Sequence, residues 1–395
     1  MPTFAPFARP LYVMSKPVGS LCNLRCSYCY YLQKAEIYKD ETPQERYTMS
    51  DRTLETFIRQ YIEAQTQPQV LFTWHGGEPL MRPLSFYKRV LELQRRYARG
   101  HLIDNCLQTN GTLLTDEWCA FFREHNWLIG ISIDGPQDLH DEYRRARGGQ
   151  PSFVKVMRGI RLLQKHGVEW NAMGVVNDYN ADYPLDVYHF YKEAGCKYIQ
   201  FTPIVERDLQ QEGHLLPFSV SPGQYAHFCC TIFDEWVRHD VGEVFVQLFD
   251  STLARWVGEE PGVCSMGETC GHASVVEHNG DLYSCDHFVY PEYLLGNIHT
   301  DTVTSMMYSQ RQLQFGRAKR DALPSQCRTC QWLTICNGGC PKDRFCQTAD
   351  GEPGLSYLCQ DFRQFFAHVA PYMDFMKNEL ENKRPPANVM DFSRS

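Results

Sequence analysis

The chain has 395 residues, with 39 Lys and Arg against 47 Asp and Glu, which gives a formal net charge of −8. This charge argues against a nucleic-acid-binding surface, which would need a basic face, and no apolar run reaches the roughly 18 residues of a membrane span. The first residues, MPTFAPFARPLYVMSKP, lack the continuous apolar segment of a secretory signal, so a cytoplasmic protein is expected.

The chain also has 17 cysteines, many more than packing requires. In a reducing compartment, clustered cysteines indicate metal ligands or catalysts before disulfides.

Short apolar or β-branched segments alternate with helical patterns over the first 200 residues. The predicted strands are 11–16, 69–74, 102–108, 128–133, 170–176 and 198–204. The predicted helices are 51–65, 84–99, 116–125, 153–166 and 185–194, with Ser50 as the N-cap of the first. A further helix is predicted over 223–238, and the last residues, 381–395, are expected to be loosely ordered.

Six strands alternating with helices predict an α/β fold, with a parallel sheet that is curved or closed like a barrel. A polar or Gly-rich stretch follows every predicted strand, in the order CNLRCSYC, HGGEP, TNG, DGP, ND and VER. In such folds the functional residues collect at the carboxyl ends of the strands. The six stretches together therefore predict one site.

The stretch after the first strand contains three cysteines, Cys22, Cys26 and Cys29, at C-x3-C-x2-C spacing. Three thiolates around a [4Fe–4S] cluster leave one iron without a protein ligand, and that iron can chelate a small molecule through an amine and a carboxylate. The alternative is a zinc site whose fourth ligand comes from elsewhere, for example His75.

After about residue 222 the alternation ends, and eight scattered cysteines predict a second domain stabilised by metal. Four of them read C-x2-C-x5-C-x3-C, and eight thiolates divide into two four-thiolate clusters or, alternatively, two zinc knuckles. The eight are Cys264, Cys270, Cys285, Cys327, Cys330, Cys336, Cys340 and Cys359. The other six, Cys106, Cys119, Cys196, Cys229, Cys230 and Cys346, are expected to be core or incidental residues.

The three-cysteine motif, with Tyr28 before its last cysteine and the GGEP stretch after the second strand, resembles the radical S-adenosylmethionine superfamily. The eight later cysteines and the GDLYSC stretch resemble the twin-cluster SPASM domain. This resemblance implies a partial (β/α)6 barrel at 1–235, a SPASM domain at 236–375 and a tail at 376–395. It implies three [4Fe–4S] clusters and S-adenosyl-L-methionine as cofactors. The implied grouping is Cys264, Cys270, Cys285 and Cys340 for one auxiliary cluster, and Cys327, Cys330, Cys336 and Cys359 for the other.

Residues 10–380, with stretches such as LQTNGTLLTDEW, ISIDGP and CDHFVYPEYLLGNIHT, resemble the anaerobic sulfatase-maturating enzymes. These oxidise a Cys or Ser of a sulfatase polypeptide to Cα-formylglycine, after a 5′-deoxyadenosyl radical removes a hydrogen from Cβ. The resemblance implies that Asp286 is the general base. The implied S-adenosylmethionine site is Tyr28, Gly77, Ser132, Arg144 and Val205. His75 and Leu80 depart from the family, which often has Gln and Thr there.

The resemblance implies a sulfatase polypeptide as substrate and an electron donor such as a flavodoxin or ferredoxin. A competing interpretation is another SPASM-type enzyme that forms a thioether or crosslink in a peptide, but the 21 residues before Cys22 are too few for a leader-peptide-binding domain. A second competing interpretation is an electron-transfer or zinc-binding module without catalysis.

Overall fold

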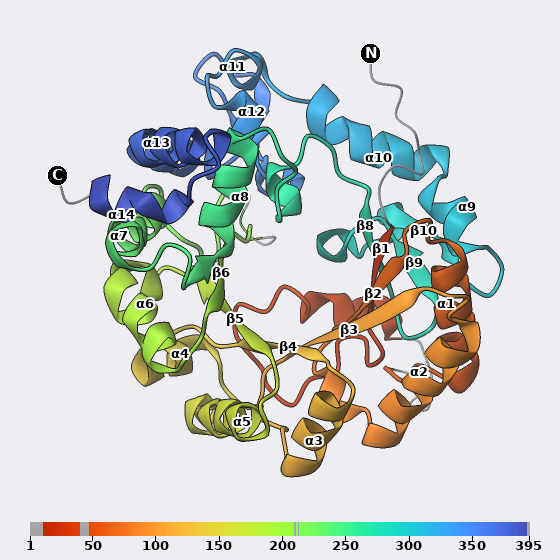
Figure 1. The fold of residues 1–395 in the computed structure, drawn as a ribbon. Coiled ribbons are helices and arrows are strands. Elements are labelled where there is room, and N and C mark those ends of the chain that lie inside the picture. Colours follow the sequence, from red (N-terminus) through yellow and green to blue (C-terminus); the bar gives the residue numbers. More distant parts are fainter. Residues whose placement is uncertain (1–10, 40–46, 209–210, 212, 393–395) are drawn as a thin grey trace. The chain divides into compact units, whose positions relative to one another are not determined.

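A computed structural model of the chain describes residues 11–39, 47–208, 211 and 213–392. The chain divides into two compact units, and Figure 1 shows its elements. The first unit comprises residues 1–132, 143–170 and 270–317, and the second comprises residues 133–142, 171–269 and 318–395.

The first unit is built on a sheet in the order β10-β9-β8-β1-β2-β3-β4. Strands β1 (Tyr12–Ser15), β2 (Gln69–Trp74), β3 (Leu102–Thr109) and β4 (Leu128–Ser132) pair in parallel, and β8 (Ala273–Val276) adds in parallel to β1. Strands β9 (Asp281–Tyr283) and β10 (Leu294–Asn297) continue it in antiparallel pairing. The parallel strands bring the carboxyl ends of β1 to β4 to one edge.

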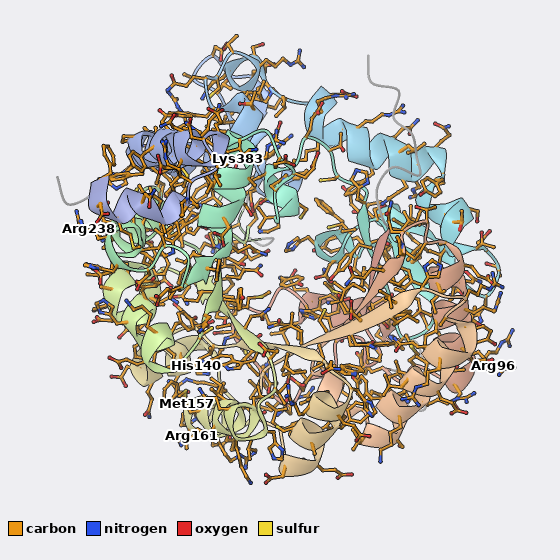
Figure 2. All side chains as sticks on the ribbon, in the orientation of Figure 1. Arg96, His140, Met157, Arg161, Arg238 and Lys383 are labelled. Atoms are coloured by element: carbon orange, nitrogen blue, oxygen red, sulfur yellow. The ribbon has the colours of Figure 1, made fainter. Side chains whose placement is uncertain are left out.

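Helices α1 (Asp51–Glu63), α2 (Leu84–Tyr97), α3 (Asp116–Glu124) and α5 (Phe153–His166) lie outside the strands of this unit (Figure 1). The backbone N–H of Thr53 donates to the Ser50 hydroxyl at 3.1 Å, which confirms the predicted N-cap. Arg96, labelled in Figure 2, donates to Glu55 at 3.2 Å and so links α2 to α1. Two helices of this unit, α9 (Val303–Met307) and α10 (Gln310–Asp321, ending beyond its boundary), follow β10.

The second unit pairs β5 (Trp170–Val176), β6 (Tyr198–Pro203) and β7 (Phe245–Val246) in parallel. Its helices include α6 (Pro184–Glu193), α7 (Gln224–His239), α8 (Gln247–Trp256) and α13 (Cys359–Glu381). The long α13 packs against α7 and α8, where the ring of Phe249 lies 5.2 Å from Phe233 and 5.8 Å from Phe365. Burial of such rings contributes the main stabilisation of a core.

The structure confirms the predicted α/β fold with parallel strands, and each of the six predicted strands is present. Helices α1, α2, α3, α5, α6 and α7 match the predicted helices to within about two residues at each end. The sequence did not predict β7 to β10, which are two to four residues long. It also missed α4 (Gln137–Tyr143).

The expectation of a loosely ordered tail is wrong for the residues that the structure describes. Residues 389–392 form the short helix α14 (Val389–Phe392), which packs on α7. The Phe392 ring stacks 4.8 Å from Phe375 of α13. Residues 393–395 of that tail lie outside the described residues.

Within the described ranges, every helix is too short or too polar to cross a membrane.

Candidate active site

The loop that carries Cys22, Cys26 and Cys29 follows β1 and is fixed by hydrogen bonds to residues 143–147. The N–H of Arg25 donates to the carbonyl of Arg145 at 2.8 Å, and that of Ser27 donates to Tyr143 at 3.2 Å. The Arg147 side chain donates to the carbonyl of Cys22 at 2.9 Å. The three cysteines therefore lie on one loop, and residues 143–147 of the same unit hold that loop in place.

That second segment places Arg144 against Tyr28. The guanidinium lies 5.4 Å from the centre of the Tyr28 ring, and both side chains are buried. Burial excludes the solvent-exposed role that the DEYRRARGG sequence would suggest for Arg144. Two of the five predicted S-adenosylmethionine residues are thus in contact.

The GGEP loop after β2 presses against the residues just before Cys22. Gly77 N–H donates to the Gly19 carbonyl at 2.7 Å, and Glu78 N–H donates to the Leu21 carbonyl at 2.8 Å. A Cβ on Gly77 would collide with the Leu21 carbonyl oxygen. Glycine is required here because the two loops approach so closely.

Glu78 joins the ends of β2 and β3 and is fully buried. One carboxylate oxygen accepts from Asn110 N–H at 2.8 Å, and the other accepts from Thr109 Oγ1 at 2.7 Å and Leu80 N–H at 3.0 Å. Burial raises the pKa of Glu78 to about 7, although these hydrogen bonds act in the opposite direction. The sequence analysis did not single out Glu78 for this role. A carboxylate inside a Gly-Gly-x-Pro turn is the signal that could have indicated it.

We expect Glu78→Ala to lower the free energy of unfolding by about 3 kcal/mol or more, because it leaves three buried donors without their acceptor. The measurement is urea unfolding of the anaerobic holoenzyme. The control is Glu92→Ala, which removes an exposed carboxylate that pairs with Arg89 at 2.8 Å and should cost less than about 1 kcal/mol. Equal losses for the two variants would contradict the structural role of Glu78.

Two further predicted cofactor residues lie on different units. Ser132 ends β4 in the first unit and accepts from Gln108 Nε2 at 2.9 Å. Val205 belongs to the second unit, where its carbonyl accepts from Lys342 Nζ at 3.1 Å. The grouping of Tyr28, Gly77, Ser132, Arg144 and Val205 into one site stays a prediction.

Asp286 lies in a buried polar network of the first unit. Lys16 Nζ is 2.7 Å from Asp286 Oδ1, and the hydroxyl of Tyr30 donates to Oδ2. Lys34 Nζ donates to the backbone carbonyl of Asp286. Because Tyr30 directly follows Cys29, this contact ties Asp286 to the cysteine loop.

The two lysines control the charge of Asp286. Burial alone would raise the pKa of Asp286, but the ammonium groups of Lys16 and Lys34 outweigh burial and hold it well below its usual range. Burial lowers the pKa of Lys34 to about 8, against the opposing effect of the Asp286 carboxylate. Asp286 is therefore an ionised carboxylate at neutral pH, as an acceptor of a proton must be.

His75, the candidate fourth zinc ligand, contacts Lys16. Its Nδ1 lies 3.3 Å from Lys16 Nζ and accepts from Gly76 N–H at 2.8 Å. Burial, with the Lys16 charge in addition, lowers the pKa of His75 to about 3, so the ring is neutral. His75 supports the lysine that pairs with Asp286.

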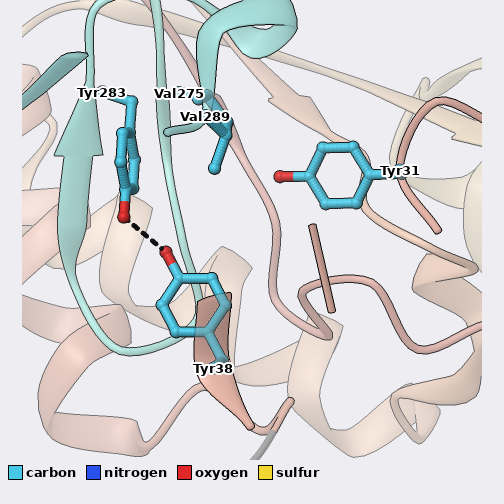
Figure 3. Close-up of a cluster of buried hydrophobic side chains, with 5 residues drawn as sticks. All are labelled: Tyr31, Tyr38, Val275, Tyr283 and Val289. Carbon is cyan, nitrogen blue, oxygen red and sulfur yellow. Dashed lines mark hydrogen bonds between the residues drawn. The ribbon is translucent and has the colours of Figure 1, made fainter. Parts of the chain in front are cut away.

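A cluster of buried side chains, drawn in Figure 3, contacts this network through Tyr31. It is formed by Tyr31, Tyr38, Val275, Tyr283 and Val289, and Tyr38 donates to the Tyr283 hydroxyl at 3.0 Å. The Tyr31 hydroxyl donates to Glu277, and Lys16 Nζ lies 4.3 Å from the centre of the Tyr31 ring. The Tyr31 ring thus packs against the buried ammonium of Lys16, the group that pairs with Asp286.

Four of the later cysteines line one cavity of about 470 Å³ in the second unit. They are Cys327, Cys330, Cys336 and Cys359, the set that the resemblance to the SPASM domain assigns to one auxiliary cluster. Burial raises the pKa of Cys336 to about 12 and that of Cys359 to about 11, so a bound metal must displace their protons. A cavity bounded by four thiols fits an iron–sulfur cluster.

The other predicted auxiliary set is divided between the units. Cys264 and Cys340 belong to the second unit and Cys270 and Cys285 to the first, and their grouping stays a prediction. Lys319 Nζ donates to the Cys264 carbonyl at 2.8 Å, and Cys270 N–H donates to the Gly316 carbonyl at 3.0 Å. Of the six cysteines expected to be incidental, Cys119, Cys196, Cys229 and Cys230 are buried, and Cys106 and Cys346 are partly buried.

Two family models match the two parts of the chain that carry the clustered cysteines. The family model of the Radical SAM superfamily matches residues 17–191, and the SPASM model, described as an iron–sulfur cluster-binding domain, matches residues 264–331. The first range contains the cysteine loop and the GGEP turn. The second contains Cys264, Cys270, Cys285, Cys327 and Cys330.

Curated relatives cover nearly the whole chain. A serine-type anaerobic sulfatase-maturating enzyme of Bacteroides thetaiotaomicron is 65% identical over 98% of this chain and 96% of its own length. A serine-type enzyme of Klebsiella aerogenes is 38% identical over 93% of this chain and 88% of its own length. A cysteine-type enzyme of Clostridium perfringens is 31% identical over 94% of this chain and 100% of its own length.

A solved structure has the same fold as this chain over nearly its whole length. Native anSMEcpe with bound AdoMet and Cp18Cys peptide has a TM-score of 0.84 and 31% identity, covering 94% of this chain and 100% of that chain.

Proposed function

The chain belongs to the family of anaerobic sulfatase-maturating enzymes, and we propose that the residue it oxidises to Cα-formylglycine is a serine of a sulfatase polypeptide. The observation that carries the choice of serine is the 65% identity to a serine-type enzyme, against 31% to a cysteine-type enzyme. Oxidation of serine to the aldehyde removes two protons and two electrons from the side chain.

The cofactors of this chemistry are iron–sulfur clusters and S-adenosyl-L-methionine, which when bound supply an organic radical that removes one hydrogen atom from the serine Cβ. Cys22, Cys26 and Cys29 would hold the cluster of the first unit. Tyr28 and Arg144, in contact beside that loop, would line the S-adenosylmethionine site, with Arg144 as a fork for a carboxylate. Gly77 holds the loop that would meet the methionine amino group.

Asp286 would accept the proton of the serine hydroxyl. Lys16 and Tyr30 hold both carboxylate oxygens, so its orientation is set before a substrate binds. A carboxylate whose pKa is held low is a weak base toward an ordinary alcohol. It suits a hydroxyl that has become more acidic because its carbon already carries the radical, so proton transfer follows removal of the hydrogen atom.

The remaining electron must leave the substrate, and the thiols of the auxiliary sets would hold the clusters that receive it. The cavity lined by Cys327, Cys330, Cys336 and Cys359 supports this proposal, because its four thiols could hold one such cluster. An external donor is also needed to reduce the cluster of the first unit, and we propose a small electron carrier such as a flavodoxin or ferredoxin.

We expect the enzyme to convert a serine-containing sulfatase peptide with a higher kcat/KM than the same peptide with cysteine at that position. The measurement is anaerobic turnover of the two peptides in one vessel, with product followed by mass spectrometry. A peptide with alanine at the position is the control and should stay unchanged. Faster conversion of the cysteine peptide would overturn the assignment to serine and leave formylglycine formation itself intact.

A further inference from the structure

Asn110, which follows β3, directs its side-chain amide at the sulfur of Cys22. Asn110 Nδ2 lies 3.7 Å from Cys22 Sγ and 2.9 Å from Asn23 Oδ1. The backbone N–H of Leu24 donates to the same sulfur at 3.3 Å. Cys22 Sγ thus receives two N–H groups, one from its own loop and one from the distant TNG stretch.

The orientation of the amide is determined by its other contacts. Asn110 Oδ1 accepts from the Thr112 hydroxyl at 2.6 Å and from Thr112 N–H at 3.0 Å, so the nitrogen must face Cys22 and Asn23. The Asn110 backbone N–H donates to Glu78, and the residue is only 7% exposed. Asn110 is held at three points before any cofactor binds.

An N–H group that donates to a cluster ligand stabilises the more negative, reduced state, and therefore raises the reduction potential. We propose that Asn110 is a positioning residue for the cluster held by the three-cysteine loop, and that its amide fixes Cys22 and raises the reduction potential of that cluster. This inference rests on one part of the proposed function, namely that the three-cysteine loop binds an iron–sulfur cluster. It adds the residue that makes the cluster easier for a donor to reduce.

The test is a redox titration of anaerobic holoenzyme, followed by electron paramagnetic resonance. For Asn110→Leu, we expect the midpoint potential of the first-unit cluster to become more negative, with the auxiliary midpoints unchanged. Cleavage of S-adenosylmethionine should fall with a donor of moderate potential and recover with a stronger reductant such as titanium(III) citrate. Asn378→Leu is the control: it makes the same change at an exposed asparagine of α13, so the midpoint of the first-unit cluster should stay near that of the native enzyme.

Asn110→Asp is the second variant, because it keeps the Oδ1 acceptor for Thr112 and loses the donor. A midpoint unchanged in both Asn110 variants would overturn the proposal, whatever happens to formylglycine yield. If neither variant retains the cluster, the native enzyme is labelled with ¹⁵N-asparagine and its cluster is reduced. Pulsed electron paramagnetic resonance then measures whether a side-chain nitrogen couples to the cluster. A side-chain nitrogen coupling supports the contact, and its absence contradicts the contact.

Discussion

Asp286→Asn should lower the rate of formylglycine formation by about 100-fold or more, the range expected for loss of a general base. Asn keeps the size of Asp286 and can still accept from Tyr30, but it has no negative charge for Lys16 and cannot accept the serine proton. The measurement is the initial rate of formylglycine formation, with 5′-deoxyadenosine quantified in the same samples.

The ratio of the two products separates a catalytic defect from a folding defect. If Asp286 acts on the substrate proton, 5′-deoxyadenosine will still form and will exceed formylglycine in the variant. The control is Asp301→Asn, which changes an exposed carboxylate of the same unit and should leave both rates near those of the native enzyme. A near-native formylglycine rate in Asp286→Asn would remove Asp286 from the role of base.

Cys26→Ala should abolish cleavage of S-adenosylmethionine and with it all formylglycine. Cys26 is the middle cysteine of the three-cysteine loop, and its two neighbours are themselves the other proposed ligands, so neither of them can replace it. The protein should lose the iron of one cluster and keep that of the two auxiliary clusters. Iron analysis and 5′-deoxyadenosine measurement on the same anaerobic preparation test both statements.

The matched control is Cys119→Ala, which removes a buried thiol of α3 in the same unit. This variant should keep its full iron content and its cleavage activity, apart from a loss of stability from the small cavity. Cleavage that survives in Cys26→Ala would contradict the assignment of the loop as the site of the radical chemistry.

The elements of the parallel sheet could be predicted because their sequences carry local signals. Segments 69–74 and 170–176 are short β-branched or apolar runs between turn residues, and both became strands with the predicted bounds. Ser50 could be predicted as a cap because a hydroxyl before a helical pattern has one preferred role. The carboxyl-end position of the cysteine loop and the GGEP turn followed from the topology.

The contacts that complete the candidate site could not be predicted in this way. Lys16 and Asp286 are 270 residues apart, and their 2.7 Å contact exists because β8 pairs with β1. Strands β8 to β10 are too short for a periodicity signal. The helix at 389–392 was missed for a similar reason, since its stability comes from packing on α7 and on Phe375 and not from its own sequence.

The most direct test of the whole account is mass spectrometry of a serine-containing sulfatase peptide after anaerobic turnover with S-adenosyl-L-methionine and a reductant. The account predicts a product that has lost two hydrogens at the serine, reacts as an aldehyde and forms together with one equivalent of 5′-deoxyadenosine. A peptide recovered unchanged beside 5′-deoxyadenosine, or one that carries a crosslink and no aldehyde, would contradict it.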